Sequence, residues 1–436
     1  MKIKKTISCL ILTLMLVGML TVALNVRTVD ALASHSPILI NGDSEFTPEN
    51  GVTGGNGTAT KPYIIEGWAI DASTANGIMI VNTSAYFIIR NVVVQNGTLG
   101  NFVAVKLQNV TNGVVMKIAS TNNYGLALLN EVSRTKIENN TAIDFGRIWM
   151  DEYSQYNSIA LNYLYSATYE SSIEAGGNYS YVVGNTIIQA TNGINVSGSF
   201  NKVYTNQISK AKGCAILLGS TGHSNLVVGN DVSYSTEGIA IDGSSNNYIV
   251  GNKVHHNTNG TTVAHPTNSS SGNYIVRNDV YSNDKGIVFD ETPSSENFIH
   301  HNKFYDNELQ KYNVPGAVNA WDDGYPSGGN YWKDYTGTDL YRGPYQNETG
   351  SDGIGDIPYP IDENNNDTYP LMNPPLFGDV NNDRVVNMRD IGMVVNAFGS
   401  FPDRSKWNIF ADLNYNFRID LKDIGLVCAN FGKQQP

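Results

Sequence analysis

The chain has 436 residues, more than one compact core normally accommodates, so several structural units are expected. Its formal net charge of −12 excludes the basic surface by which proteins usually bind nucleic acids. Only 16% of the residues are charged, while glycine and tyrosine are abundant, at 42 and 25 residues. This composition favours strands and turns over helices.

The N-terminus has the pattern of an export signal. Three early lysines precede an apolar stretch over residues 7–24, and Ala31-Leu32-Ala33 then offers a cleavage site between small residues. We therefore expect a signal peptide over residues 1–33 and a mature protein that is secreted or lies at the cell surface. The apolar stretch is long for a signal, so an uncleaved anchor is the alternative. No later segment is apolar enough to span a membrane.

A repeat of roughly two dozen residues runs through the middle of the chain. Residues 181–185 read Tyr-Val-Val-Gly-Asn, and related sequences end at Asn230, Asn252 and Asn302. From Asn140 onward, the steps between these asparagines are 22, 23, 21, 24, 22, 26 and 24 residues. Alternating apolar residues in each repeat predict short strands with valine and isoleucine facing inward.

One such repeat cannot bury its own apolar face, so the repeats must stack into a solenoid. The predicted fold is mainly β, with a parallel β-helix over residues 34–318 and an acidic cap over residues 319–372. Asparagines that recur at one turn are expected to form a hydrogen-bonded ladder along the axis.

The repeats resemble those of NosD-like secreted proteins, within the superfamily of carbohydrate-binding and sugar-hydrolase β-helices. The resemblance extends to Pro62-Tyr63-Ile64-Ile65-Glu66-Gly67-Trp68, typical of archaeal members, and to the closing stretch over residues 350–356. It implies a right-handed parallel β-helix. It also implies two possible activities, handling of polysaccharide and handling of copper; for copper, the paired histidines are His255-His256 and His300-His301.

The last part of the chain contains a duplicated twelve-residue loop. The first copy runs from Asp379 to Asp390 and the second, 33 residues later, from Asp412 to Asp423. Oxygen-bearing side chains at positions 1, 3, 5, 9 and 12, with a backbone carbonyl at position 7, suit a hard Ca²⁺ ion. Two Ca²⁺ ions are expected, with the ligands Asp379, Asn381, Asp383, Val385, Asn387 and Asp390, and Asp412, Asn414, Asn416, Arg418, Asp420 and Asp423.

This duplication resembles a type I dockerin, the module that docks into cohesin domains, because each loop ends in Asp and lacks an entering helix. The resemblance implies a small α-helical, calcium-binding module over residues 379–436, a linker over residues 373–378, and a cohesin-like protein partner. Position 6, usually glycine, is Arg384 in the first loop and Phe417 in the second. The partner-reading positions 10 and 11 fall on Met388, Arg389, Leu421 and Lys422.

A possible active site lies on the β-helix, since glycosidases need two carboxylates beside the scissile bond. Strand spacing places Asp151 and Glu174 on the order of 8 Å apart, inside the range of inverting enzymes. This pair is the predicted catalytic pair. The predicted substrate-binding residues are Arg147, Trp149, Asn195 and Lys106, from the same outward strand row and its edge. The alternative is a solvated strand face, because the motifs of known β-helix enzymes are absent.

The cap is strongly acidic. Residues 320–372 carry ten acidic side chains against Lys333 and Arg342. Such uncompensated charge favours a cation, and a third Ca²⁺ could be held by Asp352, Asp356 and Asp362. The alternative is a polar lid over the last open strand edge.

The leading hypothesis is a secreted protein that binds or processes extracellular polysaccharide and attaches to a cohesin-bearing partner through its calcium-dependent module. If it is an enzyme, it is a polysaccharide-active glycoside hydrolase or lyase. One alternative is a non-catalytic surface or adhesion protein. The other is a copper-handling protein of the NosD type.

Overall fold

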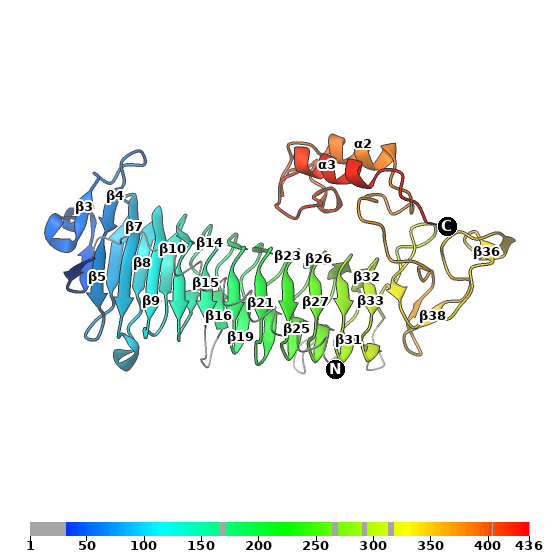
Figure 1. The fold of residues 1–436 in the computed structure, drawn as a ribbon, viewed down its shortest axis with the longest axis horizontal. Coiled ribbons are helices and arrows are strands. Elements are labelled where there is room, and N and C mark those ends of the chain that lie inside the picture. Colours follow the sequence, from blue (N-terminus) through cyan, green and yellow to red (C-terminus); the bar gives the residue numbers. More distant parts are fainter. Residues whose placement is uncertain are drawn as a thin grey trace, which may run out of the picture.

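The computed structural model describes residues 32–165, 171–263, 269–289, 294–312, 318–402 and 404–435. The signal peptide predicted over residues 1–33 lies outside them, apart from its last two residues. Figure 1 shows an elongated parallel β-helix that runs from blue N-terminal rungs to a yellow cap, with two C-terminal helices alongside it. The prediction of a parallel β-helix followed by a small helical module is confirmed.

One face of the β-helix is a parallel sheet of 12 strands. Each strand pairs in register with the equivalent strand of the next rung, as the repeat predicts. In order they are β2 (Ile38–Asn41), β6 (Ile78–Thr83), β8 (Val105–Thr111), β10 (Ala127–Ser133), β13 (Ile148–Met150), β16 (Ser171–Ala175), β19 (Asn192–Val196), β22 (Cys214–Leu218), β25 (Glu237–Ile241), β28 (Asn259–Val263), β31 (Lys285–Phe289) and β34 (Leu309–Tyr312).

The other faces form one sheet of 23 strands. Its N-terminal part holds β1 (Ala33–His35), β3 (Val52–Gly54), β4 (Tyr63–Glu66) and β5 (Trp68–Asp71), followed by the long strands β7 (Phe87–Gln95) and β9 (Gly113–Thr121). From there each rung gives two short strands to two ladders. The first ladder holds β11 (Lys136–Glu138), β14 (Ser158–Ala160), β17 (Tyr181–Val183), β20 (Lys202–Tyr204), β23 (Leu226–Val228), β26 (Tyr248–Val250), β29 (Tyr274–Val276) and β32 (Phe298–His300). The second holds β12 (Thr141–Ile143), β15 (Tyr163–Tyr165), β18 (Thr186–Ile188), β21 (Gln207–Ser209), β24 (Asp231–Ser233), β27 (Lys253–His255), β30 (Asp279–Tyr281), β33 (Lys303–Tyr305) and β35 (Tyr331–Trp332).

Stacked aliphatic side chains fill the interior. Ile159, Val182, Val203 and Val227 follow one another in register along the first ladder and are fully buried. Burying each such side chain contributes about 1.5–3 kcal/mol, so the long apolar stack stabilises the solenoid as a whole.

Asparagine ladders run inside the corners, as expected from the recurring Asn. Nδ2 of Asn206 donates to Oδ1 of Asn230 at 2.9 Å, and Asn230 donates to Asn252 at the same distance. This ladder extends from Asn140 to Asn330. Two further ladders follow other corners. These asparagines are buried, so they bind the rungs together and leave the solvent face to other residues.

The cap closes the last rung with two hairpins, β36 (Tyr341–Arg342) with β37 (Glu348–Thr349) and β38 (Tyr359–Pro360) with β39 (Asn366–Asp367). The C-terminal module contains α2 (Met388–Asn396), the short helix η4 (Ile409–Ala411) and α3 (Leu421–Asn430). No helix in the described part of the chain is long and apolar enough to cross a membrane.

Candidate calcium module and candidate sites on the β-helix

The first predicted loop gathers its acidic side chains around one point. One carboxylate oxygen each from Asp379, Asp383 and Asp390 lie within 4.8 Å of one another. The start of α2 holds Asp390, which accepts backbone N–H bonds from Asn387 at 2.8 Å and from Val380 at 2.7 Å. Converging carboxylate oxygens are the ligands that Ca²⁺ prefers.

The second loop repeats this geometry. Asp423 accepts backbone N–H bonds from Asp420 at 2.8 Å and from Leu413 at 2.9 Å. Asp412 accepts the N–H of Phe417 at 2.7 Å, as Asp379 does from the equivalent residue of the first loop. In each loop, the last Asp therefore closes a capping box with position 9 and also accepts the backbone N–H of position 2.

The chemistry of both loops fits a divalent cation. Burial raises the pKa of Asp379 to about 6, and the charges of Asp390 and Asp383 add to this. Burial raises the pKa of Asp412 to about 7, with a further contribution from the Asp423 carboxylate. A bound cation would relieve both the desolvation and the repulsion. In the second loop, Nδ2 of Asn414 is buried without a partner among the described residues, and turning the amide would present its oxygen to the ion.

The predicted substrate-binding residues lie on one row of outward side chains. Arg147 directly precedes β13, at the edge of this row. Nδ2 of Asn195 donates to both carboxylate oxygens of Glu174 at 3.0 Å. In register, the row reads Lys106, Leu128, Trp149, Glu174 and Asn195, so a leucine separates the lysine from the tryptophan.

The two predicted catalytic carboxylates accept hydrogen bonds from different neighbouring rungs. Asp151 follows β13 and accepts the backbone N–H of Glu131 on the preceding rung at 3.1 Å. It also accepts the hydroxyl of Ser154 at 2.6 Å. Glu174, by contrast, is bound by Asn195 on the following rung. The structure thus gives each carboxylate its own hydrogen-bond partners, and the catalytic pair stays a prediction.

The three cap aspartates each stabilise a turn. Asp356 accepts the backbone N–H of Leu340 at 2.9 Å, and Asp352 accepts that of Gly343 at 3.2 Å. Asp362 accepts the N–H of Asn364 at 2.7 Å. Within the described residues, these aspartates are not among the groups whose ligand atoms converge. The third Ca²⁺ therefore stays a prediction.

An open groove of about 500 Å³, which the sequence analysis missed, lies on one corner of the β-helix. The ring of Tyr234 stacks on His256 with centroids 5.0 Å apart and remains 58% exposed. The rest of the groove is lined by Asp284, by the hydroxyl-bearing residues Ser235, Thr236, Thr258 and Ser282, and by Ala211 and the ladder residue Asn257. These residues come from four rungs, so no local spacing in the sequence could reveal the groove.

Comparison with known protein families identifies two segments. Residues 377–431 match the type I dockerin domain. The C-terminal module is therefore dockerin-like. Residues 170–337 match the NosD family, described as a periplasmic copper-binding protein. No curated protein matches the sequence significantly.

Several solved β-helix structures are similar to this chain. A mutant of the periplasmic alginate epimerase AlgG is 15% identical, with a TM-score of 0.48 over 66% of this chain and 77% of that one. A PL6 family polysaccharide lyase from Pseudopedobacter saltans is 13% identical, with a TM-score of 0.43 over 72% and 99%. The catalytic unit of a GH87 alpha-1,3-glucanase from Streptomyces thermodiastaticus is 12% identical, with a TM-score of 0.42 over 64% and 63%.

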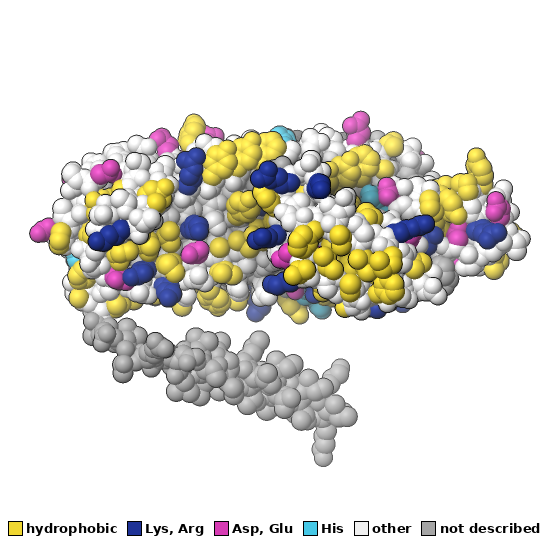
Figure 2. Space-filling model, turned by 90° about the horizontal axis from the view of Figure 1, so that it is seen from above, with side chains coloured by type: hydrophobic (Ala, Val, Ile, Leu, Met, Phe, Trp, Pro, Cys, Tyr) yellow, Lys and Arg dark blue, Asp and Glu magenta, His cyan; other side chains and the backbone are white. Residues whose placement is uncertain are grey.

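The predicted partner-reading residues of the dockerin-like module face solvent. Met388 is 66% exposed at the start of α2, and Leu421 is 74% exposed at the start of α3. Arg389 and Lys422 beside them are exposed too. Figure 2 shows apolar side chains gathered on the face of the molecule that carries the module. The two helix starts therefore present similar apolar and basic pairs.

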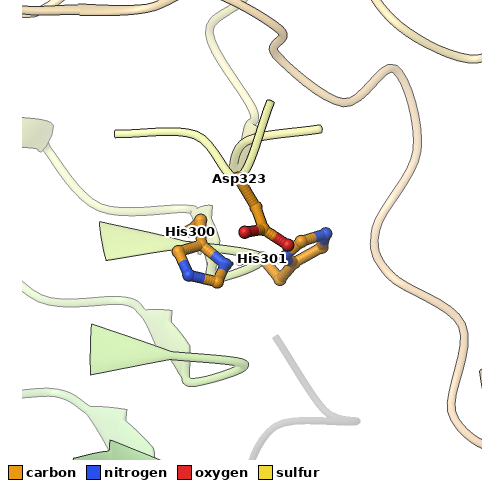
Figure 3. A group of neighbouring side chains, drawn as sticks. All are labelled: His300, His301 and Asp323. Atoms are coloured by element: carbon orange, nitrogen blue, oxygen red, sulfur yellow. Dashed lines mark hydrogen bonds between the residues drawn. The ribbon is translucent and has the colours of Figure 1, made fainter. Parts of the chain in front are cut away.

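A histidine group lies inside the segment that matches NosD. Figure 3 shows His300, His301 and Asp323 beside one another, with one ligand atom of each within 4.8 Å of the others. His301 Nε2–H donates to the Ser327 carbonyl at 3.2 Å, so its Nδ1 accepts from His300 Nδ1–H at 2.7 Å. Burial lowers the pKa of both histidines, which favours these neutral tautomers. This network accounts for the pair without a metal ion, and copper handling stays a prediction.

Proposed function

We propose that the chain is an extracellular β-helix protein that attaches to a cohesin-like partner through calcium-dependent docking of its dockerin-like module. The observation that carries this is a pair of matched loops, each closed by a capping box at a helix start, with three carboxylates converging in the first loop. Calcium would organise each loop and so fix the position of the exposed helix start that follows it. One ion for each loop is part of the proposal.

Capture of a purified type I cohesin by the immobilised full chain tests this function. We expect capture in Ca²⁺ and its loss in chelator. Met388→Asp and Leu421→Asp should each weaken capture modestly, because the other helix start remains, and the double variant should weaken it more than about 30-fold. Ile357→Asp, on the exposed surface of the cap, is the matched control. Equal capture by the double variant and the control would refute the assignment.

We further propose that the β-helix binds polysaccharide. The groove beside Tyr234 supports this, because an exposed aromatic ring beside hydroxyl-bearing residues and a carboxylate suits a sugar better than an apolar ligand. A finer proposal is that Asp151 and Glu174 process the polysaccharide. The row that holds Trp149 and Asn195 would then bind the polysaccharide next to these two carboxylates.

Binding and release assays on a panel of acidic and neutral polysaccharides separate these proposals. Tyr234→Ala should lower affinity about tenfold, while Tyr345→Ala, on an exposed tyrosine of the cap, should not. If the chain is an enzyme, Asp151→Asn or Glu174→Gln should abolish the release of reducing sugar. Binding without release would retain the groove and discard the catalytic pair.

A further inference from the structure

The dockerin-like module lies directly on the β-helix, and its calcium loops form the contact together with the segment from Trp407 to Phe410. Figure 1 shows the module above the rungs that contain β23 to β32. A shared apolar cluster joins Val228 and Val250 of the β-helix to Ile409 and Phe417 of the module. All four are at most 8% exposed. The ring of Phe417 meets Tyr204 edge-on, with centroids 4.4 Å apart.

At the β-helix corner under the module, the side chain of the corner residue differs from rung to rung, and its size fits the module residue that lies over it. Each rung turns there through one residue with positive φ, and the side chain at that position varies. At Gly229 and Gly251 the corner is bare, and Tyr415 occupies the space. A Cβ atom on Gly229 would lie 2.7 Å from the Tyr415 ring, and one on Gly251 would lie 2.1 Å from its hydroxyl oxygen.

The next corner residue, Arg277, holds the first loop. Its Nη2 donates to the carbonyl of Asp379 at 2.7 Å and to that of Val380 at 3.2 Å, and it also bonds Asn382. Its guanidinium lies over the ring of Phe410 at 4.7 Å. The bonded carbonyls belong to loop positions 1 and 2, so none of them is the position 7 carbonyl expected to bind calcium.

The contacts explain the unusual residues at position 6. Arg384 and Phe417 stand there with φ of 66° and 59°, a backbone region that favours glycine. Arg384 donates to the carbonyl of Pro326 in the cap at 2.8 Å, and Phe417 packs on the β-helix. Position 4 behaves alike, because Asn382 and Tyr415 also have positive φ and touch the β-helix. Both positions therefore contact the β-helix or its cap, while the helix starts remain exposed.

We propose that the two calcium loops also form an intramolecular docking surface, so that calcium binding and seating of the module on the β-helix are thermodynamically coupled. The inference deepens the proposed function, on whose calcium ions it rests. Calcium orders positions 4 and 6 of each loop in the left-handed backbone that the contact requires. Seating in turn favours the loop conformation that binds calcium, since coupling between two equilibria is reciprocal.

Calcium titration calorimetry of the full chain tests the coupling through β-helix residues that bind no calcium. Gly251→Asn fills the space of Tyr415, yet Asn tolerates the left-handed backbone. Gly184→Asn is the control, at the same corner three rungs earlier, where a Cβ meets only the tip of exposed Leu161. We expect Gly251→Asn to weaken calcium affinity roughly 5–150-fold and the control to retain it.

A second pair of variants guards against misfolding at a corner. Val228→Asn places an amide in the apolar contact, and Val183→Asn places it at the same strand position outside that contact. Small-angle scattering should show the module released in Val228→Asn and in wild type with chelator, but seated in Val183→Asn with calcium. If Gly251→Asn and Val228→Asn are folded and bind calcium with wild-type affinity, the coupling is overturned, but the proposed function is not. Absence of calcium binding in wild type would overturn the proposed function as well.

Discussion

At the scale of single residues, Asp367 shows how the end of the solenoid is closed. Asn330 is the last asparagine of its ladder, so its N–H donors have no asparagine of a further rung to bond. A carboxylate, which only accepts hydrogen bonds, can take that place. Asp367 is fully buried and accepts the Asn330 backbone N–H at 2.7 Å and the Trp332 indole N–H at 2.8 Å. Burial nevertheless raises the pKa of Asp367 to about 7.

The raised pKa of Asp367 predicts a pH-dependent cap. A group whose pKa is higher in the folded state contributes stability that is complete below its unfolded pKa, near 3.9, and is lost as the pH rises through about 7. Asp367→Asn should remove this dependence, because Asn mimics the protonated acid. We expect the stability of wild type relative to Asp367→Asn to fall between pH 4 and 8, by on the order of 4 kcal/mol at most. Melting temperatures of wild type and Asp367→Asn, measured at several pH values, check this. If both proteins changed with pH by the same amount, the assignment would be contradicted.

At the scale of elements, the ladders decide which asparagines matter. Asn230 accepts bonds from the backbone N and the Nδ2 of Asn206, and it donates to Val203 and Asn252. Removing this side chain leaves buried polar groups of two neighbouring rungs without partners. Such groups cost about 1–3 kcal/mol each.

We therefore predict that Asn230→Ala destabilises the β-helix by about 2–5 kcal/mol. Asn347→Ala, on an exposed asparagine of the cap, should change the stability by less than about 0.5 kcal/mol. Chemical denaturation followed by circular dichroism in the β region measures both. Equal midpoints for the two variants would mean that water replaces the ladder bonds.

At the scale of the whole molecule, contact of the module with the β-helix sets how the proposed partner would be oriented. The linker predicted over residues 373–378 leads into a module that bonds both the β-helix and the cap. The exposed starts of α2 and α3 then have a set orientation to the solenoid axis. A partner bound there would hold the groove beside Tyr234 in a defined position.

The sequence by itself determined the features that depend on local spacing. The repeat of apolar residues and asparagines predicted the solenoid and its ladder, because both follow from stacking equivalent positions. The convergence of Asp379, Asp383 and Asp390 was predictable for the same reason, since one short loop brings them together. The residues at position 6 departed from the usual glycine without a reason in the sequence, because the contacts that explain them lie outside the loop.

Only the tertiary structure decided which distant residues meet. Arg277 reaches Asp379, Tyr415 lies on Gly251, and Asp367 ends a ladder that starts more than two hundred residues earlier. Asp151 follows the strand that carries Trp149, and Glu174 lies on the next strand, yet they bond to opposite rungs because each finds a different neighbour. Such contacts depend on how the completed solenoid, cap and module pack, and packing selects among many pairings that the sequence pattern permits equally.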